Sequence, residues 1–192
     1  MLFRSTWLEV DSVRGNWYLF SDKPNLAIAQ YQKALATEPN HGISRLFLGR
    51  AYLATGRQDE AIAEFERADQ AMGHVPFSAG ELGHALARVG KRAEAERLPA
   101  EMMTRRQRGY DPAFAVAWIH IGLGNREEAL DWTERAVDER LAGFYLPSVD
   151  PIYDSLRREP RFQSLLARMN LPDVAAFRAQ SRAGAFAWLR RR

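Results

Sequence analysis

Residues 48–68 read LGRAYLATGRQDEAIAEFERA and predict two helices joined by a short turn. Apolar side chains recur at helical spacing on both sides of Thr55-Gly56-Arg57. Glycine suits the left-handed conformation that ends many helices, so Gly56 marks the turn. Asp59 and Glu60 then favour the first turn of a second helix, where acidic groups interact well with the helix dipole.

This pattern recurs along the chain with a period of 34 residues. Gly56, Gly90 and Gly124 mark the turns at this interval. Small residues follow the same interval at Gly15, Gly49, Gly83 and Ala117, and at Ala27, Ala61, Ala95 and Ala129. Small residues allow close approach of two helices, while large residues such as Tyr52 and Phe65 fill the space beside them. A fixed period in this range predicts a stacked repeat array, in which no unit buries its apolar face alone.

These residues resemble the pattern of the tetratricopeptide repeat family. The second unit carries the resemblance best, through Leu48-Gly49, Tyr52, Ala61, Phe65 and Ala68. The resemblance implies an all-α fold, a right-handed α-α superhelix of four helix-turn-helix repeats at about 8–41, 42–75, 76–109 and 110–143. Two departures predict a less regular second half. Pro99 should kink or shorten its helix, and Thr133 replaces the large aromatic residue of the fourth repeat.

The repeat phase is lost after Gly143, and residues 144–192 are expected to form capping helices and a basic tail. Asp150-Pro151 and Glu159-Pro160 each predict a helix start, with proline in the first turn. A helix is also expected from Asp173, before a terminal arginine triplet. The closing segment resembles the C-terminal repeat array of bacterial multidomain signalling proteins, which implies a fragment or a stand-alone relative of such an array.

The first helix of each repeat lines the concave surface in this family, which implies a groove that binds partners. Its expected lining is mostly apolar with a few polar points. The groove positions carry over onto Asn16, Leu46, Arg50, Leu53, Phe77, His84, Phe114, Trp118 and Ile121. Aromatic anchors would supply most of the binding energy. An alternative stays open, because Phe114, Trp118 and Ile121 could instead pack against the irregular C-terminal segment.

The residues predict no catalytic or metal chemistry. The chain has 192 residues, of which 46% are hydrophobic, and it contains no cysteine, so thiolate sites and disulfides are excluded. None of the four histidines stands in a metal-ligand or catalytic spacing. No paired acid and base groups are recognisable. We therefore expect a protein that is not an enzyme and needs no cofactor.

Charge and hydropathy narrow the expected partners. The net charge is +3, and residues 172–192 carry five arginines against one aspartate, so the rest of the chain is about neutral. The basic clusters lie at predicted helix ends, and we expect no nucleic-acid partner. No segment predicts a signal peptide or a bilayer span, so we expect no membrane partner and a cytoplasmic location.

The sequence thus predicts a non-enzymatic module that binds a peptide or protein in the concave groove. The alternative is a regulatory or dimerisation segment of a bacterial multidomain signalling protein, such as a kinase, cyclase or winged-helix regulator. In that case the convex or end surfaces would contact a neighbouring domain or a second copy of the chain.

Overall fold

The computed structural model describes residues 2–104, 111–141 and 145–170, with the side chains of residues 2–9 and 149 left out. These residues form α-helices, one short 3-10 helix and no strand. The elements are α1 (Leu2–Phe20), α2 (Pro24–Thr37), α3 (Gly42–Ala54), α4 (Gln58–Ala71), α5 (Pro76–Arg88), α6 (Arg92–Thr104), α7 (Ala113–Leu123), α8 (Arg126–Asp138), α9 (Leu146–Val149), η1 (Pro151–Ser155) and α10 (Pro160–Met169). The predicted all-α class is confirmed. The helix expected from Asp173 lies outside the described residues.

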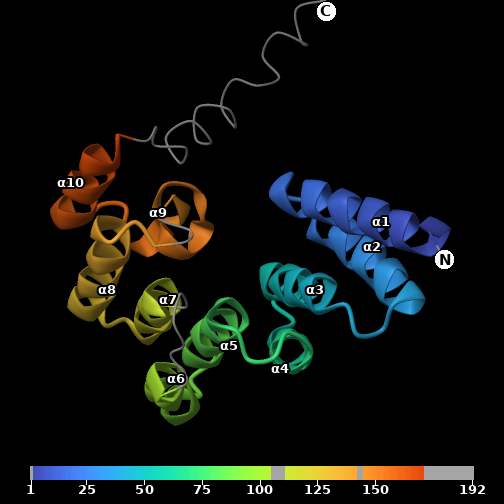
Figure 1. The fold of residues 1–192 in the computed structure, drawn as a ribbon, viewed down its shortest axis with the longest axis horizontal. Coiled ribbons are helices and arrows are strands. Elements are labelled where there is room, and N and C mark those ends of the chain that lie inside the picture. Colours follow the sequence, from blue (N-terminus) through green and yellow to red (C-terminus); the bar gives the residue numbers. More distant parts are fainter. Residues whose placement is uncertain (1, 105–110, 142–144, 171–192) are drawn as a thin grey trace, which may run out of the picture.

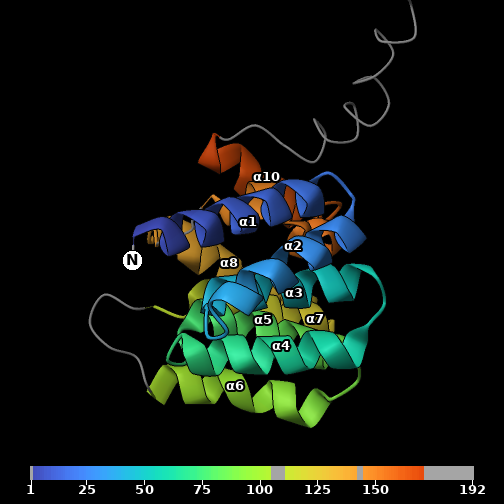
Figure 2. The same ribbon diagram turned by 90° about the vertical axis from the view of Figure 1, so that its right-hand side faces the viewer.

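The helices form a curved stack of antiparallel pairs. Figure 1 shows α1, α3, α5 and α7 succeeding one another along the inside of an arc, with α4 and α6 outside α3 and α5. Seen from the side, α4 and α6 again lie beneath α3 and α5 (Figure 2). Each inner helix packs on its neighbours in sequence, as a repeat solenoid requires.

The predicted turns end the inner helices as expected. Gly56, Gly90 and Gly124 have φ angles of 77°, 86° and 76°, a backbone conformation that favours glycine. Gly49 serves a different purpose, because a Cβ atom there would lie 2.9 Å from the Phe65 ring. The α3 backbone therefore approaches α4 through this glycine, and Phe65 fills the space beside it.

The buried apolar residues form two clusters that divide the molecule along its arc. The first cluster extends from Ala27 and Tyr31 in α2 to Val116 and Ile119 in α7. The second joins α7 and α8 to the C-terminal segment. Its members include Phe114, Trp118, Leu130, Tyr153, Leu156, Phe162 and Leu165. The predicted helix starts at Asp150-Pro151 and Glu159-Pro160 open η1 and α10 and bring this segment onto the stack.

Two residues depart from the repeat pattern, Pro99 in α6 and Thr133 in α8. Helix α6 continues through Pro99 to Thr104, so of the expected kink or shortening the shortening is wrong. Buried residues on both sides of the proline, Ala95 and Met102, hold the helix against the stack despite the lost hydrogen bond. Thr133 is fully buried, and its hydroxyl donates to the Ala129 carbonyl at 2.6 Å. The Tyr153 hydroxyl reaches Thr133, so an aromatic ring from the C-terminal segment compensates for the one missing from α8.

Candidate protein-binding face

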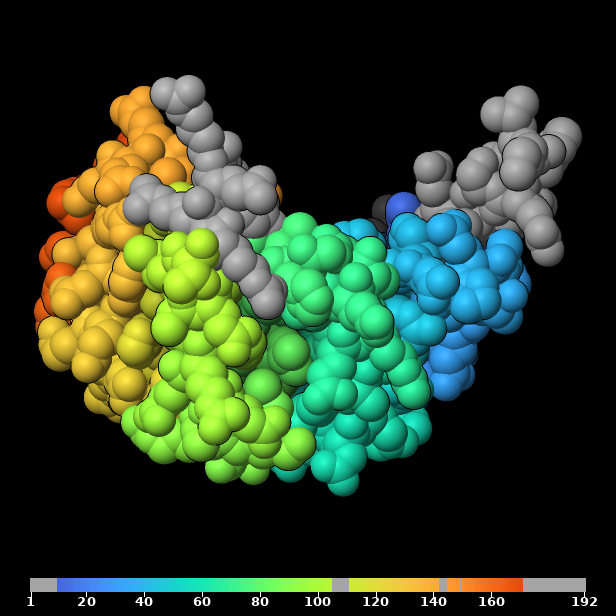
Figure 3. Space-filling view, turned by 60° about the horizontal axis from the view of Figure 1, so that its bottom comes forward, coloured from blue at the N-terminus to red at the C-terminus, as the bar shows by residue number. Residues whose placement is uncertain are grey.

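The molecule is a crescent, and its hollow side is the candidate binding surface. Figure 3 shows the two ends, α2 in blue and the C-terminal segment in orange, rising on either side of the central helices. We call the inner sides of α1, α3, α5 and α7 the concave face. The segment 145–156, which contains α9 and η1, lies at one end of the same arc (Figure 1).

The N-terminal half of the concave face is open. Ile43 of α3 is 39% exposed, and Asn16, Leu19 and Leu53 are partly exposed. The Asn16 carboxamide oxygen accepts a hydrogen bond from the Tyr31 hydroxyl at 2.6 Å, which fixes the orientation of the amide. This half therefore offers apolar side chains around an oriented polar group.

A cluster of three charged side chains occupies the centre of the face. Arg50 of α3 donates from Nε to the Glu81 carboxylate of α5 at 3.0 Å and from Nη2 to the Asp150 carboxylate at 3.1 Å. Asp150 also accepts the backbone N–H of Ile152 at 3.0 Å, so it caps η1 at the same time. The guanidinium lies 5.6 Å from the centre of the Phe47 ring. Residues 100 positions apart are thus joined across the hollow.

Burial sets the electrostatics of this cluster. Burial raises the pKa of Glu81 above its ordinary value, although the Arg50 cation opposes that shift. Burial alone would lower the pKa of Arg50, but the carboxylates of Glu81 and Asp150 raise it, so the guanidinium stays charged. One cation faces two carboxylates here. Removing Arg50 would leave both carboxylates buried without a counter-ion, which is costly.

His84 of α5 lies beside this charged cluster and forms a hydrogen bond with α7. Its Nδ1 is 2.9 Å from the Trp118 carbonyl oxygen, an atom that only accepts, so Nδ1 carries the proton. Burial lowers the pKa of His84 to about 4, and the neighbouring cations Arg88 and Arg50 add to this effect. The imidazole is therefore neutral at pH 7 and acts as a hydrogen-bond donor between α5 and α7.

The C-terminal half of the concave face is covered. Trp118 is 1% exposed, and its indole Nε1 donates to the Tyr153 hydroxyl at 3.1 Å. The Phe77 ring packs edge-on against Trp118 with centroids 5.6 Å apart. Phe114 is buried in the same cluster, and Ile121 packs against it. The C-terminal segment thus occupies the surface that α7 would otherwise offer, as the alternative reading of these aromatic residues expected.

The structure therefore separates the nine predicted groove residues into two groups. Asn16, Leu53, Phe77 and Ile121 keep some exposed surface, and Arg50 keeps a little beside its carboxylates. Buried positions are Leu46, His84, Phe114 and Trp118, so these four side chains present almost no surface to a partner. Sequence reasoning missed Glu81 and Asp150. A glutamate within the small and apolar run FSAGELGHALA was the available signal for Glu81.

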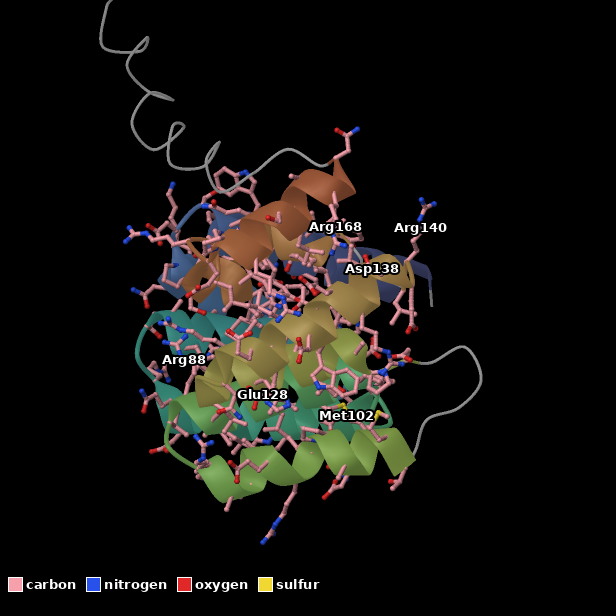
Figure 4. The ribbon with its side chains drawn as sticks, turned by 90° about the vertical axis from the view of Figure 1, so that its left-hand side faces the viewer. Arg88, Met102, Glu128, Asp138, Arg140 and Arg168 are labelled. Carbon is pink, nitrogen blue, oxygen red and sulfur yellow. The ribbon has the colours of Figure 1, made fainter. Side chains whose placement is uncertain are left out.

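The C-terminal end of the crescent is closed by a charged outer surface. Arg161 of α10 contacts three carboxylates of α8, namely Glu127 at 3.2 Å, Asp131 at 2.6 Å and Glu134 at 2.7 Å. Arg168 of α10 lies 3.6 Å from Asp138 of α8, and Figure 4 shows the two side by side. Surface ion pairs of this kind contribute little stability, but they keep this end polar.

The described part of the chain contains no group of three histidine, aspartate or glutamate side chains arranged to hold a metal ion. Within the same residues, no helix has both the length and the apolar character needed to cross a bilayer.

Comparison with known proteins identifies part of the array. Residues 14–74 match the family model described as tetratricopeptide repeat. The chain is also similar to the cytochrome c-type biogenesis protein CycH of Rhizobium meliloti (strain 1021), with 29% identity over 122 residues. The match covers 63% of this chain and 31% of CycH, so the chain spans about a third of the length of that relative.

Proposed function

We propose, because this chain is a tetratricopeptide repeat protein, that it binds a peptide segment of a protein partner on the open N-terminal half of its concave face. The family generally serves as a non-catalytic protein-interaction module. The proposed lining consists of Asn16, Leu19, Ile43 and Leu53, with the Arg50 cluster at its inner end. No catalytic step is part of this proposal.

One contrast carries the proposal. Asn16 and Leu19 of α1 and Ile43 and Leu53 of α3 keep exposed surface, whereas Phe114 and Trp118 of α7 are buried beneath the C-terminal segment. Ile43 and Leu53 provide apolar anchor points, and Asn16 is already held in one orientation by Tyr31. Anchors on a rigid, preformed surface lose little conformational entropy on binding. An extended or helical peptide with apolar residues suits this surface.

The proposal is tested by selecting ligands from a displayed library of random peptides against the full chain. Ile43→Glu places a charge among the proposed anchors. Because truncating a good anchor costs about 2 kcal/mol, we expect peptides selected on the native chain to bind this variant roughly 30-fold more weakly. Titration by isothermal calorimetry measures the difference.

Met103→Glu is the matched control. Met103 is 37% exposed and lies on α6 in the outer layer, whereas Ile43 is 39% exposed and lies on α3 in the inner layer. The same chemical change should leave peptide affinity unaltered at Met103. Equal losses in both variants, or selected peptides that ignore Ile43→Glu, would contradict binding on the open half of the concave face.

A further inference from the structure

The N-terminal end of the solenoid carries an uncovered apolar surface. Val10, Val13, Trp17 and Phe20 recur at intervals of three and four residues along α1, and they are between 40% and 64% exposed. We call these four residues the N-terminal stripe. Lys23 lies over the Trp17 ring at 5.5 Å from its centre. The stripe exposes on the order of several hundred Å² of apolar surface, at the upper end of what soluble monomers present.

The repeat period indicates what kind of contact belongs on this surface. Positions 34, 68 and 102 residues after Val10, Val13 and Trp17 take the same places in the later repeats, and all but one are buried. These positions are Ser44, Phe47, Ala51, Ser78, Glu81, Ala85, Pro112, Ala115 and Ile119. Only Phe47 among them is half-buried, and its ring stacks on Tyr31 of α2 at 6.2 Å.

Individual contacts show the same coverage. The Ser44 hydroxyl lies 2.9 Å from the Ser12 hydroxyl of α1, and the Ser78 hydroxyl donates to Asp69 of α4 at 2.6 Å. In α7, Ala115 packs against the backbone of Gly80 in α5. Val10, Val13 and Trp17 thus lie on the surface on which a preceding helical pair would stack, whereas Ala54 and Arg88, the positions equivalent to Phe20, stay exposed in the later repeats. Apart from Lys23 beside Trp17, no described residue of this chain covers the stripe.

Among the described residues, the opposite end of the stack does not offer a matching surface. Helix α10 turns its buried residues Phe162, Leu165 and Leu166 inward and presents Gln163, Ser164 and Arg168 outward. Head-to-tail stacking of two copies would therefore place the apolar stripe against polar and charged groups. An isologous contact avoids this mismatch, because it uses the same patch on both copies.

The order of residues along the stripe favours such a contact. Its two valines lie towards the start of α1, and its two aromatic residues lie towards the end. If two α1 helices cross antiparallel about a point near Gly15, Val10 faces Phe20 of the other copy and Val13 faces Trp17. Each small side chain then meets a large one, which allows close packing. A parallel arrangement would oppose aromatic to aromatic and valine to valine.

We propose that the N-terminal stripe is a self-association site, at which a second copy of this chain packs its own α1 antiparallel to the first around a two-fold axis. Two crescents then join end to end through their N-terminal hairpins. This contact does not depend on the peptide binding proposed for the concave face.

Sedimentation equilibrium of the full chain tests the proposal. The native chain should show a reversible dimer, and Trp17→Glu should weaken dimerisation by roughly several hundred-fold, because each dimer loses two buried anchors of about 2 kcal/mol each. Met103→Glu, which also charges an exposed apolar residue, should dimerise like the native chain. Thermal melting by circular dichroism verifies that both variants fold. A native chain that stays monomeric at several hundred micromolar, or a Trp17→Glu dimer of native strength, would overturn the proposal.

Cysteine pairing tests the antiparallel register. The chain has no cysteine, so each introduced thiol is unique. Because Val13 is expected to face Trp17 of the second copy, mild oxidation of mixed Val13→Cys and Trp17→Cys chains should give mainly the mixed disulfide. Homodisulfides in the proportion expected from random collision would overturn the register and with it the two-fold contact.

Discussion

At the scale of single residues, buried polar side chains link the inner helices to one another. Arg50, Glu81 and Asp150 join three elements by charge, and His84 joins two by a neutral hydrogen bond to the Trp118 carbonyl. The two arrangements respond differently to pH. The guanidinium stays protonated throughout the accessible range, whereas the imidazole binds a proton more weakly in the folded chain than in the unfolded chain.

His84 should make the protein less stable in mild acid. Its pKa falls from 6.5 to about 4 on burial. The stability of the folded chain is unaffected by the titration of His84 above pH 6.5 and falls as the pH drops to about 4. Over this range the unfolded chain binds a proton at His84, whereas the folded chain does not. The loss amounts to about 3 kcal/mol in the free energy of unfolding. Urea unfolding at a series of pH values measures it.

His84→Asn supplies the control, because the amide nitrogen can donate in place of Nδ1 but does not titrate. The variant should show a flatter dependence of unfolding free energy on pH between 7 and 4 than the native chain. Glu81, whose pKa is raised by burial, changes stability in the opposite direction and is common to both proteins. Identical pH slopes would contradict a buried neutral imidazole.

Among the elements, the C-terminal segment determines which half of the concave face is covered. The segment from α9 to η1 places Asp150 against Arg50 and Tyr153 against Trp118, so it closes half of the concave face. The helical hairpins could be predicted because turns at Gly56, Gly90 and Gly124 and small residues such as Gly49 are local features of the repeat. The covering of Trp118 could not be assigned, because it depends on residues 35 positions away in a segment without the repeat pattern.

Tyr153→Phe tests how the segment is held. The change removes the hydroxyl that accepts from the Trp118 indole at 3.1 Å and leaves a buried N–H without its acceptor. An unsatisfied buried donor costs about 1–3 kcal/mol, so the midpoint of urea unfolding should fall accordingly. Met103→Leu is the control, since Met103 is exposed and surface changes usually stay within about 0.5 kcal/mol. Equal effects of the two changes would contradict a structural role for the Tyr153 hydroxyl.

Over the whole molecule, the crescent is asymmetric in two ways. Its N-terminal end exposes the apolar stripe of α1, while its C-terminal end presents ion pairs such as Arg168 with Asp138 (Figure 4). Its concave face is open over α3 and covered over α7. The 34-residue period fixes how the hairpins stack, but it does not determine the covering of α7, because α9 and η1 lie outside the repeat pattern.

Thiol labelling of single-cysteine variants tests the half-open concave face most directly, because the native chain contributes no thiol. Ile43→Cys on α3 should react in the native state at nearly the rate seen in urea. Phe114→Cys on α7, which takes a buried position beneath the C-terminal segment, should react roughly 100-fold more slowly in the native state than in urea. Equal protection at the two positions, or fast labelling at position 114, would contradict a concave face that is open at one half and covered at the other.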